Sequence, residues 1–396
     1  MSRSFFAWRA GLAALFALVF LALAAGCTRG RGAPSANQAS PGALAAGAAS
    51  TAALQPLPLQ DAGVGAAGHP GTASAEDHVI GAGRVLGNLV VYPITSRTQS
   101  DVGPLIALDD ALASGAAEVR ESGGAGAVNT LVIENKGTLP IFVLAGTIVK
   151  GGKQDRQIGQ DFIIDGKSQT PVDAFCVEHG RWTASRNGVA TGGRFQTSEV
   201  MAPSKVRAAG QYKKSQGEVW AKVGESNAAH NVAPADGTFL ASVDDASLAK
   251  ERAALAARID AALAEIQPQG DLTGLAYAID GEVRGVRWFA HHKVFLLVQK
   301  RLVNGVALEA MTARAEAVAH RRPPSSKPAP TPAAVDAFVQ GVEREAVSEQ
   351  RDTRAANTNV YKESGSAYGS KTMMKGSPTA GRPAPTKPVS QDFTSK

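Results

Sequence analysis

The chain has 396 residues, two cysteines and a formal net charge of +6 at neutral pH. The basic excess lies near the C-terminus, because residues 321–396 hold 12 Lys or Arg against 7 Asp or Glu. Residues 79–320 are close to neutral, which argues against a nucleic-acid-binding core. A chain of this length can bury a hydrophobic core of ordinary domain size.

The N-terminus has the pattern of a secretory signal peptide over residues 1–26. Arg3 and Arg9 come before an apolar run at residues 12–25, which is shorter than the roughly 20 residues that span a bilayer. The run ends in Leu-Ala-Ala-Gly-Cys, which resembles a bacterial lipobox, so we expect Cys27 to carry lipid, including palmitate. The alternative is an ordinary signal peptide that is cleaved elsewhere nearby.

The residue after the lipobox cysteine bears on localisation. Thr28 stands where an aspartate would favour retention in the inner membrane, so resemblance to sorted lipoproteins predicts a cell-envelope protein on the outer membrane, facing the periplasm. The chain has only one other cysteine, Cys176. If Cys27 is lipidated, Cys176 has no cysteine to pair with, so no intramolecular disulfide is expected. The membrane is therefore the partner expected at the N-terminus.

Composition divides the rest of the chain. Residues 27–78 are mostly Ala, Gly, Ser and Pro, a composition typical of a disordered linker. Residues 79–375 are expected to form a single domain, interrupted by a Pro-rich insertion at about residues 321–332. Residues 376–396, rich in Gly, Pro, Lys and Ser, are expected to be a disordered tail.

The first half of the domain has the period of strands. Short apolar or alternating runs are separated by glycine-containing turns, and one short helix is expected at residues 109–114. The expected strands lie within residues 79–94, 130–134, 141–145, 162–164 and 172–177.

The second half changes to a helical period. Apolar residues recur at helical spacing over 248–266, with Asp245 as the N-cap, and again over 293–319 and 335–342. Between the first two helices, Asp280-Gly281 joins two alternating runs and predicts a hairpin. An edge strand is expected at 359–361. The fold class is therefore α+β, a β-rich N-terminal half with hairpins packed by amphipathic helices from the C-terminal half.

A glycine-rich loop, Gly-Gly-Lys-Gln-Asp-Arg at residues 151–156, carries the first unusual polar motif. It departs from a P-loop, because Gly152 stands where the lysine belongs and no Ser or Thr follows Lys153. Its backbone amides and the cations Lys150, Lys153 and Arg156 could still hold an anion. The alternative is a hairpin turn with solvated charges.

The second motif is Phe-Cys-Val-Glu-His-Gly-Arg-Trp at residues 175–182. Arg181 and Trp182 would supply a bidentate anion donor beside a stacking surface. The alternative is that Glu178 forms a structural ion pair with Arg156 or Arg181 and that Trp182 is core. Cys176 is expected to be buried and inert, because no histidine is placed to activate it.

These two motifs, together with Tyr-Lys-Glu-Ser-Gly and Tyr-Gly-Ser at 361–365 and 368–370, resemble a bacterial and archaeal family of uncharacterised function. The family is named for its association with ADP-ribosylglycohydrolases and rhodanese-type phosphatases. The resemblance covers roughly residues 79–375. It implies ADP-ribose-like or other phosphorylated compounds by association alone, with no mechanism.

The leading hypothesis is therefore a lipid-anchored envelope protein that binds a small anionic or phosphorylated ligand. One alternative is a hydrolase of a glycosidic or phosphate ester bond with Glu178 as the candidate catalyst. Another is a non-catalytic scaffold that binds another protein. We assign no metal and no cofactor. The predicted ligand-binding residues are Lys153, Gln154, Arg156, Glu178, Arg181 and Trp182. Because the two motifs lie in β-rich segments only about twenty residues apart, we expect them to be close in space, with Arg156, Glu178 and Arg181 in one polar cluster.

Overall fold

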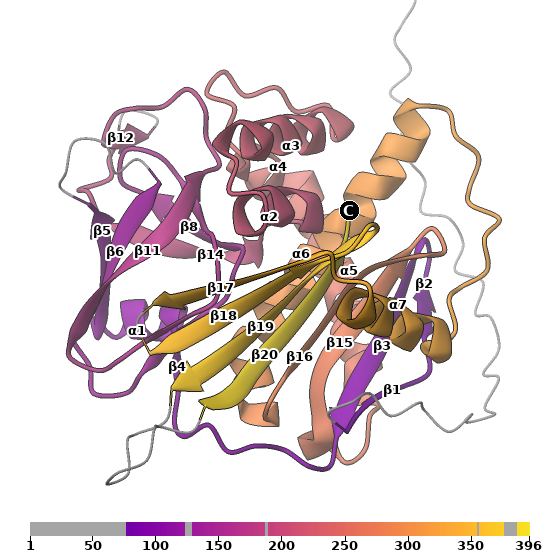
Figure 1. Cartoon of the computed structure of the whole chain (residues 1–396). Coiled ribbons are helices and arrows are strands. Elements are labelled where there is room, and N and C mark those ends of the chain that lie inside the picture. Colours follow the sequence, from indigo (N-terminus) through magenta and orange to yellow (C-terminus); the bar gives the residue numbers. More distant parts are fainter. Residues whose placement is uncertain (1–76, 123–128, 187–188, 355, 376–385) are drawn as a thin grey trace, which may run out of the picture. The chain divides into compact units, whose positions relative to one another are not determined.

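The computed structural model describes residues 77–122, 129–186, 189–354, 356–375 and 386–396. Their largest sheet has nine antiparallel strands in the order β1-β3-β15-β16-β20-β19-β18-β17, with β2 paired to β3 beside this path (Figure 1). Strands from both ends of the described region therefore meet in one sheet. The strands are β1 (His78–Ile80), β2 (Arg84–Leu86), β3 (Leu89–Ser96), β15 (Leu272–Ile279), β16 (Glu282–Phe289), β17 (Ser348–Arg354), β18 (Asn357–Glu363), β19 (Ala367–Lys375) and β20 (Thr386–Ser395).

Strand alternation gives this sheet two apolar faces. In β3, Leu89 and Val91 belong to one buried cluster, whereas Val90 and Tyr92 belong to another. The first cluster includes residues of α5 and α6, and the second includes residues of α7, so helices cover both faces (Figure 1). The three helices are α5 (Ala246–Ala264), α6 (His292–Ala319) and α7 (Pro332–Arg344).

The hairpin between β15 and β16 turns at the predicted dipeptide. Asp280 and Gly281 have φ angles of 54° and 78°, and a type I′ turn requires both to be positive. A Cβ atom on Gly281 would lie 2.5 Å from Lys327 Cβ, so this position needs glycine for space as well as for conformation.

Smaller sheets surround another apolar cluster. One has the order β14-β8-β9-β11-β6-β5, another β10-β7-β4, and β12 pairs with β13. In β6, Leu131 and Ile133 alternate into this cluster beside residues of α1. The elements are β4 (Ile106–Ala107), α1 (Leu108–Ala113), β5 (Ala117–Glu121), β6 (Thr130–Asn135), β7 (Ile141–Val143), β8 (Thr147–Gly151), β9 (Arg156–Ile158), β10 (Phe162–Ile164), β11 (Ser168–Cys176), β12 (Ser185–Arg186), β13 (Val189–Ala190) and β14 (Phe195–Met201).

Three helices cover the end of β11. Phe175 and Val177 pack with Val206, Val219 and Leu240, which lie on α2, α3 and α4 in turn. Within the described residues, no helix has both the length and the apolar character needed to cross a membrane. The remaining elements are α2 (Ser204–Gln211), α3 (Gln216–Ala229), α4 (Leu240–Asp244) and the short 3-10 helix η1 (Gln269–Asp271).

The α+β class is confirmed, and so are the long helices of the second half. Asp245 caps α5 by accepting hydrogen bonds from the backbone N–H groups of Ser247 and Leu248. Two details differ from expectation. The C-terminal half also supplies β17, β19 and β20, which were not expected, and the strand expected at an edge is β18, which lies between β17 and β19.

The prediction of a disordered tail at residues 376–396 is wrong for its last eleven residues. Residues 386–395 form β20, which pairs with β16 on one side and β19 on the other. Its composition is misleading because Ser390, Gln391 and Asp392 are buried among other polar groups instead of apolar ones. The signal peptide, Cys27 and the expected linker lie outside the described residues, apart from Asp77 and His78, and His78 begins β1.

Candidate functional site

The two polar motifs lie side by side, as the sequence predicts. β9 pairs with β11, and Cys176 lies opposite Arg156 in their register. The Arg181 guanidinium reaches across to the loop after β8, where Nη1 donates to the Gly152 carbonyl at 2.8 Å. The glycine-rich loop and the end of the second motif therefore form one structural unit.

Arg181 is 8 % exposed, and all its donors are engaged. Its Nε donates to Glu178 Oε1 at 2.8 Å, and Nη1 also donates to the Thr183 carbonyl at 2.8 Å. Its Nη2 donates to the Gly151 carbonyl at 3.2 Å and lies 3.5 Å from Asp155 Oδ1. A guanidinium with every donor occupied holds its loop in place.

Glu178 is fully buried, and both of its carboxylate oxygens accept hydrogen bonds. Oε1 accepts from Arg181, and Oε2 accepts from the Asp155 backbone N–H at 3.0 Å. Its own carbonyl accepts from Gln154 Nε2, also at 3.0 Å. Burial raises the pKa of the Glu178 carboxyl, against the lowering effect of Arg181. This geometry is that of a structural ion pair.

Arg156 has weaker contacts. It is 2 % exposed, and its Nη1 lies 3.3 Å from Gln154 Oε1. Its acidic partner is Glu121, with 3.8 Å between Arg156 Nη2 and Glu121 Oε2, so the pairing expected with Glu178 is not what forms. Arg156 is linked to the Glu178 cluster through Gln154, whose amide bonds to both residues, and through the Asp155 carbonyl, which lies 3.5 Å from Arg156 Nη1.

The other predicted residues are spread between surface and core. Lys153 is exposed, and its backbone N–H donates to Glu121 Oε1 at 3.1 Å. Trp182 is 54 % exposed and is not core. Cys176 is buried, and burial raises the pKa of its thiol. The ligand role of this cluster stays a prediction, while its structural role is evident from the hydrogen bonds.

A second buried charge network joins α2 to the large sheet. Arg207 of α2 forms an ion pair with Asp392 of β20, and Tyr212 donates to the same carboxylate at 2.8 Å. Arg287 of β16 donates to Asp161 Oδ1 at 2.7 Å. Burial alone would raise the pKa of Asp392. The charges of Arg207 and Arg287 lower it by more than burial raises it, so the pKa of Asp392 lies below its ordinary value.

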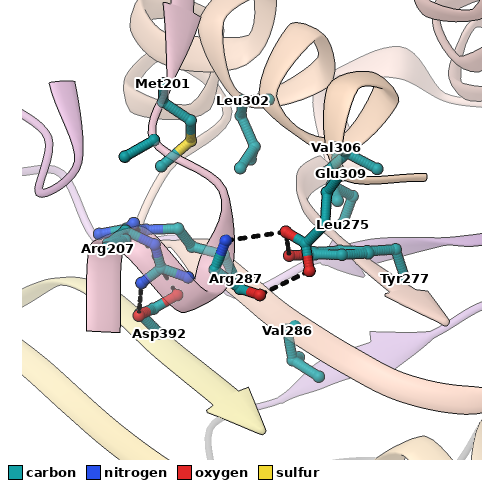
Figure 2. Close-up of a pocket in the computed structure, with 14 residues that line it drawn as sticks. Met201, Arg207, Leu275, Tyr277, Val286, Arg287, Leu302, Val306, Glu309 and Asp392 are labelled. Atoms are coloured by element: carbon teal, nitrogen blue, oxygen red, sulfur yellow. Dashed lines mark hydrogen bonds and ion pairs between the residues drawn. The ribbon is translucent and has the colours of Figure 1, made fainter. Parts of the chain in front are cut away.

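A small cavity adjoins this network (Figure 2). Its volume is about 20 Å³, room for about one water molecule. Within the described residues, Nε of Arg207 and Nε of Arg287 make no hydrogen bond. We call this space the inner cavity. Its polar lining residues are Ser204, Arg207, Tyr277, Arg287, Glu309 and Asp392.

A larger cleft shares Ser204 and Glu309 with the inner cavity. We call it the outer cleft; it has a volume of about 70 Å³. The first turn of α2 forms one wall, and α3, α6, β16 and the end of β20 contribute the others. Its charged lining residues are Lys205, Lys222, Arg284 and Lys396 with Glu225, Glu309 and Glu316.

Glu309 of α6 lies at the boundary between the two spaces. Its Oε2 accepts from the Ser204 backbone N–H at 2.8 Å and from the Tyr277 hydroxyl at 3.0 Å. Its Oε1 accepts from Ser204 Oγ at 2.5 Å. Figure 2 shows the carboxylate pointing at Tyr277. Glu309 therefore caps the N-terminus of α2 from outside that helix.

Ser226 of α3 faces the outer cleft as well. It is 4 % exposed, and its hydroxyl has no hydrogen-bond partner within the described part of the chain. An unsatisfied buried hydroxyl is costly, so a polar group in the cleft would stabilise it. The first turn of α2 adds two backbone N–H groups, of Lys205 and Val206, that lack acceptors in these described residues.

Comparison with known proteins gives a family and no function. The model of the ARG and Rhodanese-Phosphatase-superfamily-associated Protein domain matches residues 77–380. The chain belongs to this family. No curated protein and no solved structure matches it.

In this member of the ARG- and rhodanese-phosphatase-associated family, sequence reasoning missed both the inner cavity and the outer cleft. Arg207 and Asp392 are separated by 185 positions, and Ser204 and Glu309 by 105. Neither pair belongs to a local motif. The sequence around Asp392 gave no strand signal, because three consecutive polar residues, Ser-Gln-Asp at 390–392, stand between Val389 and Phe393.

Proposed function

We propose that this protein binds a small anionic ligand and that the outer cleft holds a phosphate-sized group of it. The observation that supports this most directly is the convergence on one cleft of the α2 N-terminus, cations on α2, α3 and β16, and the unsatisfied hydroxyl of Ser226. The N-terminus of a helix attracts anions through its free N–H groups and its dipole.

The size of the outer cleft restricts the ligand. A volume of about 70 Å³ corresponds to on the order of five water molecules, since one needs about 10–15 Å³. A phosphate group fits this space. A compound as large as ADP-ribose would place one phosphate-sized group in the cleft and leave the remainder at the surface.

The cations of the outer cleft can exchange partners. Lys222 pairs with Glu225 at 2.7 Å and Lys205 lies 3.9 Å from Glu316, and all four side chains are partly exposed. Exposed ion pairs contribute about 0–1 kcal/mol. A multiply charged anion could therefore replace these pairings at little cost.

The family context favours a phosphorylated ligand. The family is associated with ADP-ribosylglycohydrolase and rhodanese-phosphatase systems. The geometry gives less support to the alternative hydrolase that uses Glu178, because both oxygens of that buried carboxylate already accept hydrogen bonds. Binding without catalysis is the simpler proposal.

Titration of the full chain with inorganic phosphate, pyrophosphate and ADP-ribose tests this function. A ligand at a hundredfold excess over its Kd should raise the free energy of unfolding by about 2.7 kcal/mol. Lys205→Glu should weaken binding, whereas Lys300→Glu, a matched change outside the cleft at an exposed α6 cation, should not.

The variant Trp182→Ala separates the two candidate sites. Trp182 is exposed beside the buried Arg181 cluster and does not line the outer cleft. Binding that is lost in Trp182→Ala and retained in Lys205→Glu would move the site to the polar motifs. An absence of stabilisation by any of the three probes contradicts the proposal and favours the scaffold alternative.

We also propose that Cys27 anchors the protein to the cell envelope through lipid. The support is the lipobox sequence that ends at Cys27 after a short apolar run. Cys27→Ser should release the protein from the membrane fraction or block its processing. Membrane association of a correctly truncated Cys27→Ser protein would overturn the anchor.

A further inference from the structure

We propose that Glu309 is an internal competitor for the ligand's anionic group and therefore determines how tightly the outer cleft binds phosphate. This inference rests on the function proposed above and deepens it. Glu309 occupies the position at the N-terminus of α2 that an anion would take.

The sequence of α2 explains why Glu309 is needed there. Pro203 is the N-cap residue and has no side-chain acceptor, and the first turn of α2 has no acidic residue. The usual local cap, a Ser, Thr, Asp or Asn at this position, is missing. The acceptor comes instead from α6, more than 100 residues further along the chain.

Three donors meet at the Glu309 carboxylate. They are the Ser204 backbone N–H at 2.8 Å, Ser204 Oγ at 2.5 Å and the Tyr277 hydroxyl at 3.0 Å. Converging backbone N–H and hydroxyl donors at a helix N-terminus suit a phosphate oxygen equally well. Ser204 and Glu309 both line the outer cleft, so a ligand there meets the same donors.

The negative charge of Glu309 opposes the binding of an anion in the outer cleft. The outer cleft has four cationic and three acidic side chains, and Glu309 is the acidic one that accepts a hydrogen bond from the α2 backbone. A carboxylate and a phosphate dianion at a few ångströms repel each other even in a solvated site. Replacing Glu309 with glutamine removes this repulsion and keeps an amide oxygen that can accept from Ser204.

The test compares two matched variants in the full chain. Glu309→Gln and Glu316→Gln remove the same charge from the same helix, and both residues line the outer cleft. Glu316 pairs with Lys205 at 3.9 Å, whereas Glu309 bonds to Ser204 and Tyr277. Binding of inorganic phosphate and pyrophosphate is measured by calorimetry for all three proteins at the same mildly alkaline pH, at which inorganic phosphate is mostly the dianion.

Glu309→Gln should tighten binding of both probes by about tenfold, and Glu316→Gln by distinctly less. Equal effects of the two variants would mean that only net charge matters, and weaker binding by Glu309→Gln would make Glu309 a favourable contact; either result overturns the inference. Measurable binding by Glu309→Gln, when neither the wild type nor Glu316→Gln binds, also supports the inference. If the wild type and both variants bind neither probe, the proposed function itself fails together with the inference.

Discussion

The buried charges of this protein are paired with specific partners, and removing one partner should be costly. Arg181 engages five acceptors at 8 % exposure, and Glu178 is fully buried beside it. A buried charge without its partner loses stability because the low-dielectric interior cannot solvate it. The polar motifs are therefore expected to contribute to stability independently of any ligand.

Arg181→Ala should lower the free energy of unfolding by about 3–5 kcal/mol, because it leaves Glu178 buried without its cation. Urea denaturation measures this change. The control is Lys300→Ala, which breaks an ion pair with Glu199 between side chains that are 71 % and 70 % exposed, and which should cost less than about 1 kcal/mol. Equal small losses in both variants would contradict a structural role for Arg181.

Asp392 should make stability depend on pH at the acid end. Burial raises its pKa, but Arg207 and Arg287 outweigh burial and lower the folded-state pKa below the unfolded value of about 3.9. The folded state then binds the proton less readily, so this contribution is present above about pH 4 and is lost as pH falls through the folded pKa.

Urea midpoints between about pH 3 and pH 6 should therefore fall toward acid more steeply for the wild type than for Asp392→Asn. The variant is expected to be less stable at every pH, because Arg207 and Arg287 lose a partner. Its pH slope is the decisive measurement. Identical slopes for the two proteins would show that Asp392 keeps an ordinary pKa in the fold.

At the scale of elements, α7 covers one apolar face of the large sheet. Val335, Val339 and Val342 of this helix pack with Tyr92 of β3 and Phe393 of β20. Thr331 caps the helix by accepting from the Ala334 backbone N–H. Most of the stability of such a helix comes from its buried face, since its length of 13 residues is marginal for an isolated helix.

Val335→Ala should destabilise the protein by about 2 kcal/mol, through lost burial and the cavity that is left. Val335 is 0 % exposed, whereas Val347, just beyond the helix, is 80 % exposed. The same substitution at Val347 should change the free energy of unfolding by less than about 0.5 kcal/mol. Similar losses of unfolding free energy in the two variants would mean that Val335 of α7 does not pack against the sheet. Thermal and urea unfolding give the comparison.

At the scale of the whole molecule, β20 completes the large sheet. It lies between β16 and β19 and brings Asp392 to the buried network and Phe393 to the core under α7. The match to the family model ends at residue 380, before this strand begins. The folded unit of this chain therefore extends past the matched range.

Deletion of residues 386–396 should abolish cooperative thermal unfolding, because it opens the sheet and leaves Arg207 and Arg287 without Asp392. Deletion of residues 28–76 is the contrasting variant. Its Ala-, Gly-, Ser- and Pro-rich composition cannot supply a core, so the melting temperature should stay almost unchanged. Circular dichroism follows both transitions; a cooperative transition at the wild-type temperature without β20 would contradict its place in the core.

Local signals in the sequence determined many of the elements and one contact between them. Helical spacing predicted α5 and α6, Asp280-Gly281 predicted the β15–β16 hairpin, and the polar motifs were correctly expected to meet. These succeed because periodicity, caps and turn conformation depend on neighbouring residues. The fold class followed from the same signals, although β17, β19 and β20 were not predicted.

Only the tertiary structure decided which polar residues are buried together. Ser390 and Asp161 are 229 positions apart, and Arg287 and Asp161 are 126 apart, yet they share one buried network. Composition predicted a disordered tail there, because a polar strand is stable in a core only when distant partners satisfy it. The outer cleft is likewise lined by residues that are distant in the sequence and meet only in the folded chain. The sequence determines the local elements because their causes are local, whereas burial of charge depends on partners that only the folded chain brings together.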